Sequence, residues 1–237
     1  MEFLTRLLDD PDPRPCGRCV NCTGRGLPRE VDPALVQAAI EFLRRDLRTI
    51  EPRRRWPAGL DEMSGAIQPP LESGMALCVY GDAGFGREVQ RGKYVDGAFS
   101  AELVTASARA IRDRWRPSPA PTWVTALPST AQRGIVHDFA TRLAAALGLP
   151  YVDALTVRDG APPQKQMQNS FQQAHNAIDK LDVMADEVLP GPVLLVDDIV
   201  DSRWTLTVAG WRLQTSGSGP VHPFALAVAA GRDDGDA

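Results

Sequence analysis

From residue 75 onward, the chain alternates short, continuous apolar runs with longer segments in which apolar residues recur at helical spacing. The runs span residues 75–80, 123–127, 193–196 and 224–229. Continuous apolar runs of this length are typical of strands that are buried on both faces of a sheet. Strands separated by helices pair in parallel, because the chain must cross over between them. The pattern therefore predicts an α/β fold with a mostly parallel, twisted sheet flanked by helices.

Helices are predicted between these runs. Apolar residues recur three and four positions apart within residues 100–115, 135–147 and 206–213, which places them on one face of a helix. Gly148 and Pro150 follow the second segment and form a common stop signal for a helix.

The same criteria divide the chain into four parts. Residues 1–30 are irregular and rich in Pro, Gly and Arg around three cysteines, and they form a small appendage. Residues 31–57 hold a helix, which begins at Asp32 and Pro33, and then an arginine-rich linker. Residues 58–230 carry the α/β domain, and residues 231–237 are polar enough to be disordered.

Composition and charge narrow the class of protein. The chain has 237 residues, 43% of them hydrophobic, and its 26 basic and 30 acidic residues give a formal charge of −4. This balance does not favour nucleic-acid binding except through a local patch. No apolar run approaches the ~18 residues that a membrane-spanning helix needs, and the acidic N-terminus lacks a secretory pattern. We therefore expect a soluble, cytoplasmic protein without a membrane partner.

The most informative stretch runs from Val193 to Thr207. A buried strand ends in two carboxylates, Asp197 and Asp198, and a short polar loop over residues 201–205 leads into a helix. Ligands of open α/β sheets bind at such strand ends. A helix N-terminus with free N–H groups can cradle a phosphate, and the carboxylates can accept hydrogen bonds from a sugar. The alternative is an acidic pair that only caps a helix.

This stretch resembles the signature of type I phosphoribosyltransferases, in which two acidic residues precede a phosphate loop that ends in Thr. The resemblance implies a phosphoribosyltransferase-like fold that binds phosphoribosyl pyrophosphate or a nucleoside monophosphate, with Mg²⁺ accompanying the pyrophosphate. It implies that Asp197 and Asp198 hold the ribose and that Asp201 handles the proton of the base. The residues around the 5′-phosphate would be Ser202, Arg203, Trp204 and Thr205.

One residue departs from that signature. Arg203 stands where the family usually has Gly, whose lack of a side chain permits close backbone approach to the phosphate. The charge of Arg203 could equally assist phosphate binding. A catalytically silent sensor therefore stays open beside an active enzyme.

Two upstream segments fit the same site. Ser129, Thr130 and Arg133 lie in a basic loop after a predicted strand and could grip pyrophosphate; an ordinary turn is the alternative. Residues 163–176 are polar and resemble the mobile hood of the ComF-like branch of the family. The hood residues would include Gln164, Lys165 and Asn176. A solvated amphipathic helix explains the same pattern.

The three N-terminal cysteines have the spacing of metal ligands. Cys16, Cys19 and Cys22 form a Cys-x-x-Cys-x-x-Cys run, which supplies three of the four ligands of a structural Zn²⁺ site. The run resembles the zinc-binding module of RecQ-type DNA helicases, whose first cysteine would here precede Met1. We therefore expect the chain to be the C-terminal piece of a longer helicase, without its motor. A flexible, thiol-bearing tail is the alternative.

A second class of function follows from that resemblance. The cysteine segment and the arginines between residues 44 and 55 could help a parent helicase hold DNA in repair or recombination, since arginines neutralise phosphates without reading sequence. A solvated linker explains the arginines equally well. Residues 86–94 imitate a nucleotide-binding loop, but they have one residue too many, and Tyr94 stands where Ser or Thr must bind Mg²⁺.

Overall fold

The computed structural model describes residues 2–26, 30–60, 63–128, 134–158 and 169–230. The chain divides into two compact units, Met1–Ala39 and Ile40–Ala237. Each unit is described by itself.

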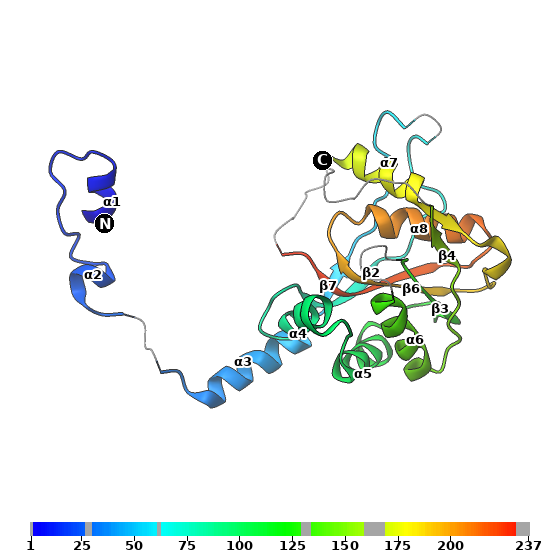
Figure 1. Ribbon diagram of the computed structural model, residues 1–237, viewed down its shortest axis with the longest axis horizontal. Helices are drawn as coiled ribbons and strands as arrows, with labels where there is room; N and C mark the ends of the chain where they lie inside the picture. The colour runs from blue at the N-terminus through cyan, green and yellow to red at the C-terminus, as the bar shows by residue number, and fades with distance from the viewer. Residues whose placement is uncertain (1, 27–29, 61–62, 129–133, 159–168, 231–237) are drawn as a thin grey trace. The chain divides into compact units, whose positions relative to one another are not determined.

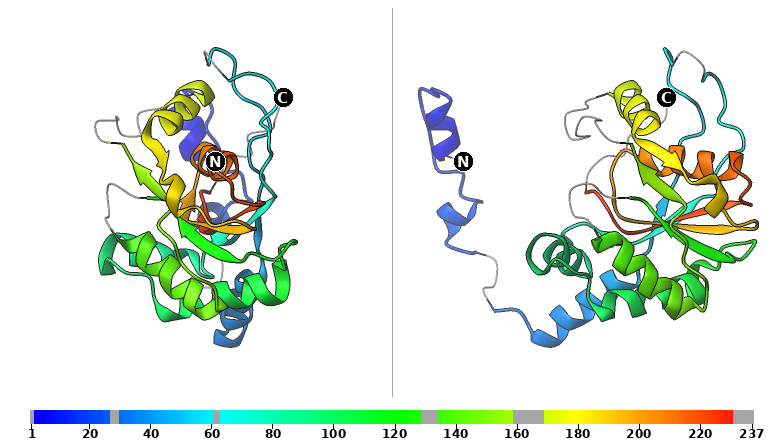
Figure 2. Two further views of the ribbon diagram at one scale, coloured as in Figure 1. Left: turned by 90° about the vertical axis from the view of Figure 1, so that its right-hand side faces the viewer. Right: turned by 45° about the vertical axis from the view of Figure 1, so that its right-hand side comes forward.

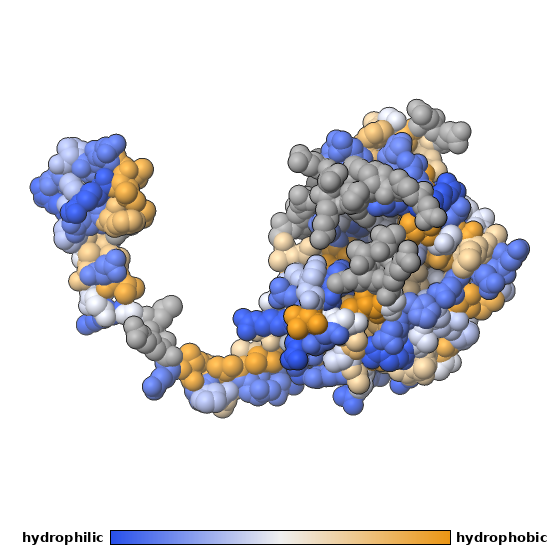
Figure 3. Space-filling model, viewed as in Figure 1, coloured by the Kyte–Doolittle hydropathy of each residue, from blue (hydrophilic) through white to orange (hydrophobic). Residues whose placement is uncertain are grey.

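The first unit consists of short helices with exposed side chains. Helices α1 (Glu2–Leu7) and α2 (Val20–Thr23) bury none of their residues, and neither does α3 (Pro33–Arg45), whose start belongs to this unit. Asp32 caps α3 as predicted, because its Oδ1 accepts the Ala34 N–H at 2.9 Å. Leu35 and Phe42 of α3 are 63% and 72% exposed, and hydrophobic side chains are visible along this helix in Figure 3.

The second unit is built on a five-stranded sheet with the order β1-β2-β7-β6-β3. Its strands are β1 (Arg48–Ile50), β2 (Gly74–Val79), β7 (Val221–Val228), β6 (Val193–Val200) and β3 (Trp123–Ala126). The four strands from β2 to β3 pair in parallel, and only the edge strand β1 is antiparallel. The predicted α/β fold with a mostly parallel sheet is therefore confirmed. Strand β1 comes from the segment that the sequence assigns to the linker, and its Ile50 is 1% exposed.

Helices cover both faces of this sheet (Figures 1 and 2). One face carries α4 (Gly86–Arg91), the π-helical segment η1 (Gly92–Asp96), α5 (Ala101–Arg109), the π-helical segment η2 (Ala110–Trp115) and α6 (Ile135–Leu147). The other face carries α7 (Ser170–Lys180) and α8 (Trp204–Thr215). A small second sheet pairs β4 (Leu155–Val157) with β5 (Leu181–Val183), and a 3-10 turn, η4 (Ala185–Glu187), follows. Within the described ranges, the helices lack the length and apolar content that crossing a membrane requires.

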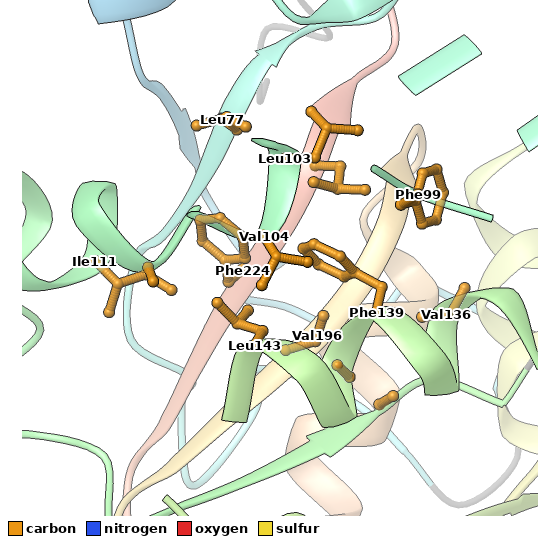
Figure 4. Packing of buried hydrophobic residues seen from close by; sticks show 14 of the residues in the cluster. Leu77, Phe99, Leu103, Val104, Ile111, Val136, Phe139, Leu143, Val196 and Phe224 are labelled. Atoms are coloured by element: carbon orange, nitrogen blue, oxygen red, sulfur yellow. The ribbon is translucent and has the colours of Figure 1, made fainter. Parts of the chain in front are cut away.

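Strand β6 shows why a continuous apolar run marks the centre of the sheet. Leu194 and Val196 pack into the cluster beneath α5 and α6, which Figure 4 shows around Phe139 and Phe224. Val193 and Leu195 belong to the cluster beneath α8. Since side chains alternate along a strand, every position of this run is buried on one face or the other. Burial of each such side chain stabilises the folded state by roughly 1.5–3 kcal/mol relative to its exposure to water.

Local signals place most element boundaries correctly. Helix α6 has the predicted bounds, and Gly148 ends it in the left-handed region with φ 74°. Ser100 caps α5 by accepting the Leu103 N–H at 3.2 Å. Strand β6 extends four residues beyond the apolar run that ends at residue 196. Asp197 and Asp198 therefore lie within the strand rather than after it.

Candidate functional site

The candidate site lies where adjacent strands send the chain to opposite faces of the sheet. Strands β3 and β6 are parallel neighbours. The chain leaves β3 into α6 on one face and leaves β6 into α8 on the other. Such a point opens a crevice at the carboxyl ends of the two strands, where α/β sheets bind ligands.

The turn from β6 into α8 has the geometry of an anion-binding loop. Arg203 adopts the left-handed conformation (φ 67°, ψ −11°) directly before the first residue of α8. Within the described part of the chain α8 has no side-chain cap at its N-cap residue Arg203, whereas Ser100 caps α5 and Asn169 caps α7. The first-turn amides of a helix lack intrahelical acceptors and carry partial positive charge. This N-terminus can therefore accept an anion at the crevice.

The side chains of the loop differ in what they can offer a ligand. Asp201 is exposed, and Thr205 is half-buried. Ser202 is 8% exposed, and Trp204 is 2% exposed. The indole of Trp204 packs into the core beneath α8 and donates to Ser170 Oγ at 2.8 Å. The Trp204 ring is therefore committed to the core, so the predicted place of this residue at a phosphate falls to its backbone.

Arg53, which the sequence assigns to the arginine-rich linker, and Trp56, to which it assigns no role, support the loop. The guanidinium of Arg53 lies over the Trp204 ring at 5.8 Å, its Nε donates to Ser202 O at 3.4 Å, and its backbone N–H donates to Thr207 Oγ1 at 3.0 Å. Trp56 stacks on Trp204 with ring centroids 6.1 Å apart. These contacts join segments about 150 positions apart in the chain, so no local pattern could reveal them.

The two carboxylates leave β6 on opposite sides, since successive side chains of a strand alternate. Asp197 Oδ1 accepts the N–H of Asp198 at 2.8 Å, and Asp198 Oδ1 accepts the Ile199 N–H at 2.7 Å. Asp198 is 7% exposed, whereas Asp197 is more open. Asp197 is thus the carboxyl group that a ligand in the crevice reaches more readily.

Lys93 is the charge partner of the pair. It lies in η1, and its Nζ is 2.7 Å from Asp198 Oδ2. In the sequence, Lys93 belongs to the segment 86–94, which fails the pattern of a nucleotide-binding loop. No spacing rule connects positions 93 and 198, so the sequence did not predict this pair.

The environment of Asp197 favours its neutral form. Burial and the negative charge of Asp198 raise the pKa of Asp197 to about 7, while the Asp198 N–H and the Lys93 ammonium act in the opposite direction. Near neutral pH a substantial fraction of Asp197 therefore keeps its proton. Such perturbed carboxyl groups cluster at functional sites.

The upstream residues of the predicted site are only partly described. Ser129, Thr130 and Arg133, and likewise Gln164 and Lys165, lie outside the described residues.

Asn176, the remaining hood residue, lies in α7. It is 4% exposed, and neither side-chain polar atom has a hydrogen-bond partner among the described residues. This position is therefore buried rather than solvent-facing.

A second polar group lies at the carboxyl end of β3. Tyr151 donates to Asp153 Oδ1 at 2.7 Å, and His137 Nε2 is 3.2 Å from Asp153 Oδ2. Together with Leu127 and Gly134 they line a small cavity of about 50 Å³. No sequence pattern assigns a role to these residues, although they flank the predicted pyrophosphate loop.

The cysteines of the first unit come together as their spacing predicts. Cys16, Cys19 and Cys22 place their Sγ atoms within 4.8 Å of one another. The Cys16–Cys22 and Cys19–Cys22 separations are 3.8 and 3.5 Å, close to the edge of a tetrahedral zinc–thiolate site, about 3.8 Å. Hydrogen bonds lower the pKa of Cys19 to about 6, which favours the thiolate that a metal binds. The donors fit three corners of a Zn²⁺ site.

The arginine-rich segment is largely tied into the fold. Arg44 pairs with Glu88 and Glu102 at 2.7 and 2.8 Å, and Arg48 pairs with Asp46 at 2.7 Å. Arg54 donates to Leu71 O at 2.7 Å. Much of the positive charge that the linker could offer to DNA is therefore engaged within the protein.

Comparisons with known proteins bear on the fold. No protein-family model and no curated protein matches the chain. Adenine phosphoribosyltransferase from Leishmania tarentolae is similar at 16% identity over 55% of this chain and 72% of its own, with a TM-score of 0.37. The Saccharomyces cerevisiae enzyme is similar at 14% identity over 81% and 89%, with a TM-score of 0.39.

A third similar structure is the glutamine phosphoribosylpyrophosphate amidotransferase of B. subtilis, complexed with ADP and GMP. It is 24% identical over 54% of this chain and 26% of its own, with a TM-score of 0.34. At these TM-scores, the function proposed below rests on the residues of this chain alone.

Proposed function

We propose that the second unit binds a ribose 5-phosphate group, as part of phosphoribosyl pyrophosphate or a nucleoside 5′-monophosphate, between the acid pair and the N-terminus of α8. The observation that carries the proposal is the turn from β6 into α8: an uncapped helix N-terminus follows a left-handed Arg203 at the carboxyl end of a parallel strand. The phosphate oxygens would accept hydrogen bonds from the backbone amides after Asp201, and the Asp197 carboxylate would accept a hydrogen bond from a ribose hydroxyl.

The same arrangement suits transfer of the phosphoribosyl group. The bond from C1′ to pyrophosphate breaks through an oxocarbenium-like state, so positioning and charge stabilisation carry the catalysis without a protein nucleophile. Asp201 is exposed beside the loop, where its carboxylate could take the proton of an incoming base. Mg²⁺ would neutralise the pyrophosphate when it is bound.

Calorimetry with the full chain tests the binding step. Ribose 5-phosphate and AMP should bind, and ribose without phosphate should not, because the helix N-terminus recognises the anion. Thr205→Val removes a hydroxyl donor at the loop and should weaken binding about fivefold to tenfold. Thr215→Val, at the opposite end of the same helix, should leave affinity unchanged. Absence of binding by every 5′-phosphate would end the proposal.

Turnover is tested separately by pyrophosphate release with purine and pyrimidine bases. Asp201→Asn should lower the rate by 10²-fold or more, as general-base variants typically do, while ribose 5-phosphate affinity stays the same. Binding without release for any base would identify a silent sensor, in which Arg203 alters the loop without abolishing phosphate recognition.

The first unit adds a second part to the proposal. Cys16, Cys19 and Cys22 would hold Zn²⁺ through their thiolates, as in the zinc-binding module of RecQ-type helicases, and the unit would serve such an enzyme in DNA repair or recombination. DNA contact by the exposed Arg45 and Arg55 belongs to the same prediction. Arg45→Ala with Arg55→Ala should weaken DNA binding and flatten its salt dependence; unchanged binding would remove DNA from the proposal.

A further inference from the structure

The contact between Lys93 and Asp198 is unusually enclosed for an ion pair of this chain. The Lys93 side chain is 22% exposed and that of Asp198 is 9% exposed, whereas the exposed pair Arg6–Glu2 shows 69% and 38%. Taking two charges out of water is costly, and the short, 2.7 Å contact offsets that cost. Asp198 of the acid pair therefore has an internal cation as its partner.

The identity of this cation is informative. The chain has 23 arginines and only three lysines, Lys93, Lys165 and Lys180. An ammonium is a compact point charge with three donors, whereas a guanidinium is a flat fork. A lysine at Asp198 therefore resembles a bound metal ion in charge density more closely than an arginine would.

The contacts of the acid pair leave few of its oxygens available to a directly bound Mg²⁺. Asp198 directs Oδ2 at the Lys93 ammonium and Oδ1 at the Ile199 amide, and Asp197 Oδ1 accepts the Asp198 amide. Mg²⁺ needs near-octahedral oxygens at about 2.0–2.1 Å, and the ammonium would repel it. Over the described ranges, the cysteine cluster is the one group of three metal-ligating side chains. The acid pair thus does not fit a directly held divalent ion.

We propose that Lys93 takes the place of a divalent cation beside Asp198, so that a sugar 5-phosphate binds at this site without Mg²⁺. This inference rests on the function proposed above. The ammonium is the counterion of Asp198, which leaves the more open Asp197 to accept a sugar hydroxyl. Mg²⁺ is then needed only where a ligand carries pyrophosphate.

Calorimetry with ribose 5-phosphate in metal-free buffer and in buffer with Mg²⁺ tests the inference on the full chain. The two affinities of the wild-type chain should agree within about twofold. Lys93→Gln removes the ammonium and leaves Asp198 without its counterion, so its affinity in metal-free buffer should fall by about tenfold. Mg²⁺ should restore most of that loss. Lys180→Gln, at the end of α7, is the matched control and should behave as wild type.

The outcomes separate the inference from the function beneath it. Wild-type binding that appears only with Mg²⁺ overturns the role of Lys93 and leaves phosphate binding intact. No binding in either buffer ends the proposed function itself. If Lys93→Gln does not fold, the wild-type comparison still decides, and Lys93→Arg, which keeps the positive charge, should retain most of the metal-free affinity; a tenfold loss in a folded Lys93→Arg would contradict a role for the charge alone.

Discussion

At the scale of single residues, the candidate site depends on a few side chains held in uncommon states. Arg203 adopts a positive φ that favours glycine. Asp197 has a pKa raised to about 7 by burial and by Asp198. Each state costs stability, and the surrounding fold maintains it at the end of β6. Such local costs commonly accompany function.

Replacing Arg203 with Gly should relieve backbone strain. The left-handed conformation costs a non-glycine residue roughly 1–2 kcal/mol, and the variant loses one weak hydrogen bond from Arg203 to Glu51 O at 3.3 Å. The free energy of unfolding should rise by about 0.5–1 kcal/mol in urea denaturation. Arg116, exposed with φ 52° at the end of η2, is the control: Arg116→Gly should stabilise similarly and leave phosphate affinity unchanged. A loss of stability at both positions would contradict the strain argument.

The raised pKa of Asp197 predicts a pH dependence of stability. The folded chain keeps a proton on Asp197 up to pH of about 7, whereas the unfolded chain releases it near pH 4. The folded state therefore binds the extra proton in this window, and the free energy of unfolding falls as pH rises through it. The fall should be on the order of 1 kcal/mol, because the side chain is partly open to water.

Asp197→Asn provides the comparison for that measurement. The amide cannot ionise, so the difference in urea stability between wild type and variant should change between pH 4 and pH 7 and be constant above about pH 8. A difference that is independent of pH across this window would mean that Asp197 titrates normally.

At the scale of elements, the packing of α8 against the core positions the loop over residues 201–203, which precedes this helix. Seven residues of α8 are buried, including Trp204, Leu206 and Leu213. Gly210 lies against Leu71, where an added Cβ would come within 2.3 Å of Leu71 Cδ2. The absence of a side chain at Gly210 therefore lets α8 pack closely against Leu71, which fixes the distance between this helix and the segment that precedes β2.

Gly210→Ala should destabilise the protein although alanine is the better helix former. Helix propensity gains about 1 kcal/mol, but overpacking against Leu71 costs typically 1–3 kcal/mol, so the net change should be a loss of about 1 kcal/mol in urea denaturation. Adding Leu71→Ala to the variant opens space, and the two changes should be less harmful together than their sum. Strict additivity would show that the clash is absorbed elsewhere.

At the scale of the whole molecule, the chain consists of two units with separate chemistry. The first unit gathers three thiols, and the second carries the turn from β6 into α8 for which phosphate binding is proposed. The fourth cysteine, Cys78, is buried at 1% exposure in the sheet, and burial raises the pKa of its thiol. It serves as an internal control for chemistry at the other three.

Zinc should protect the three clustered thiols without affecting the second unit. With Zn²⁺, thiol titration of the native chain should show slow reaction of Cys16, Cys19 and Cys22, and a chelator should make them reactive, since the thiolate is both ligand and nucleophile. Cys78 should react only after unfolding in either condition. Calorimetric unfolding of the second unit should keep its midpoint. Fast reaction of all three thiols in Zn²⁺ would exclude a metal site.

The elements of this protein could be read from its sequence because helices and strands follow local periodicity. The bounds of α6, the cap at Ser100, the buried run of β6 and the position of the loop between β6 and α8 all follow from neighbours in the chain. The three thiols also meet as expected, since two-residue spacers separate successive cysteines by about one turn of chain.

Folding, by contrast, selected the partners of those residues. Lys93 meets Asp198, Arg53 supports Ser202, and Trp204 turns its ring into the core rather than toward the loop. These contacts join segments more than 100 positions apart. Their geometry depends on how the crossover connections place helices on each face of the sheet. Hydrophobic periodicity predicts which side chains are buried but not which of them contact one another.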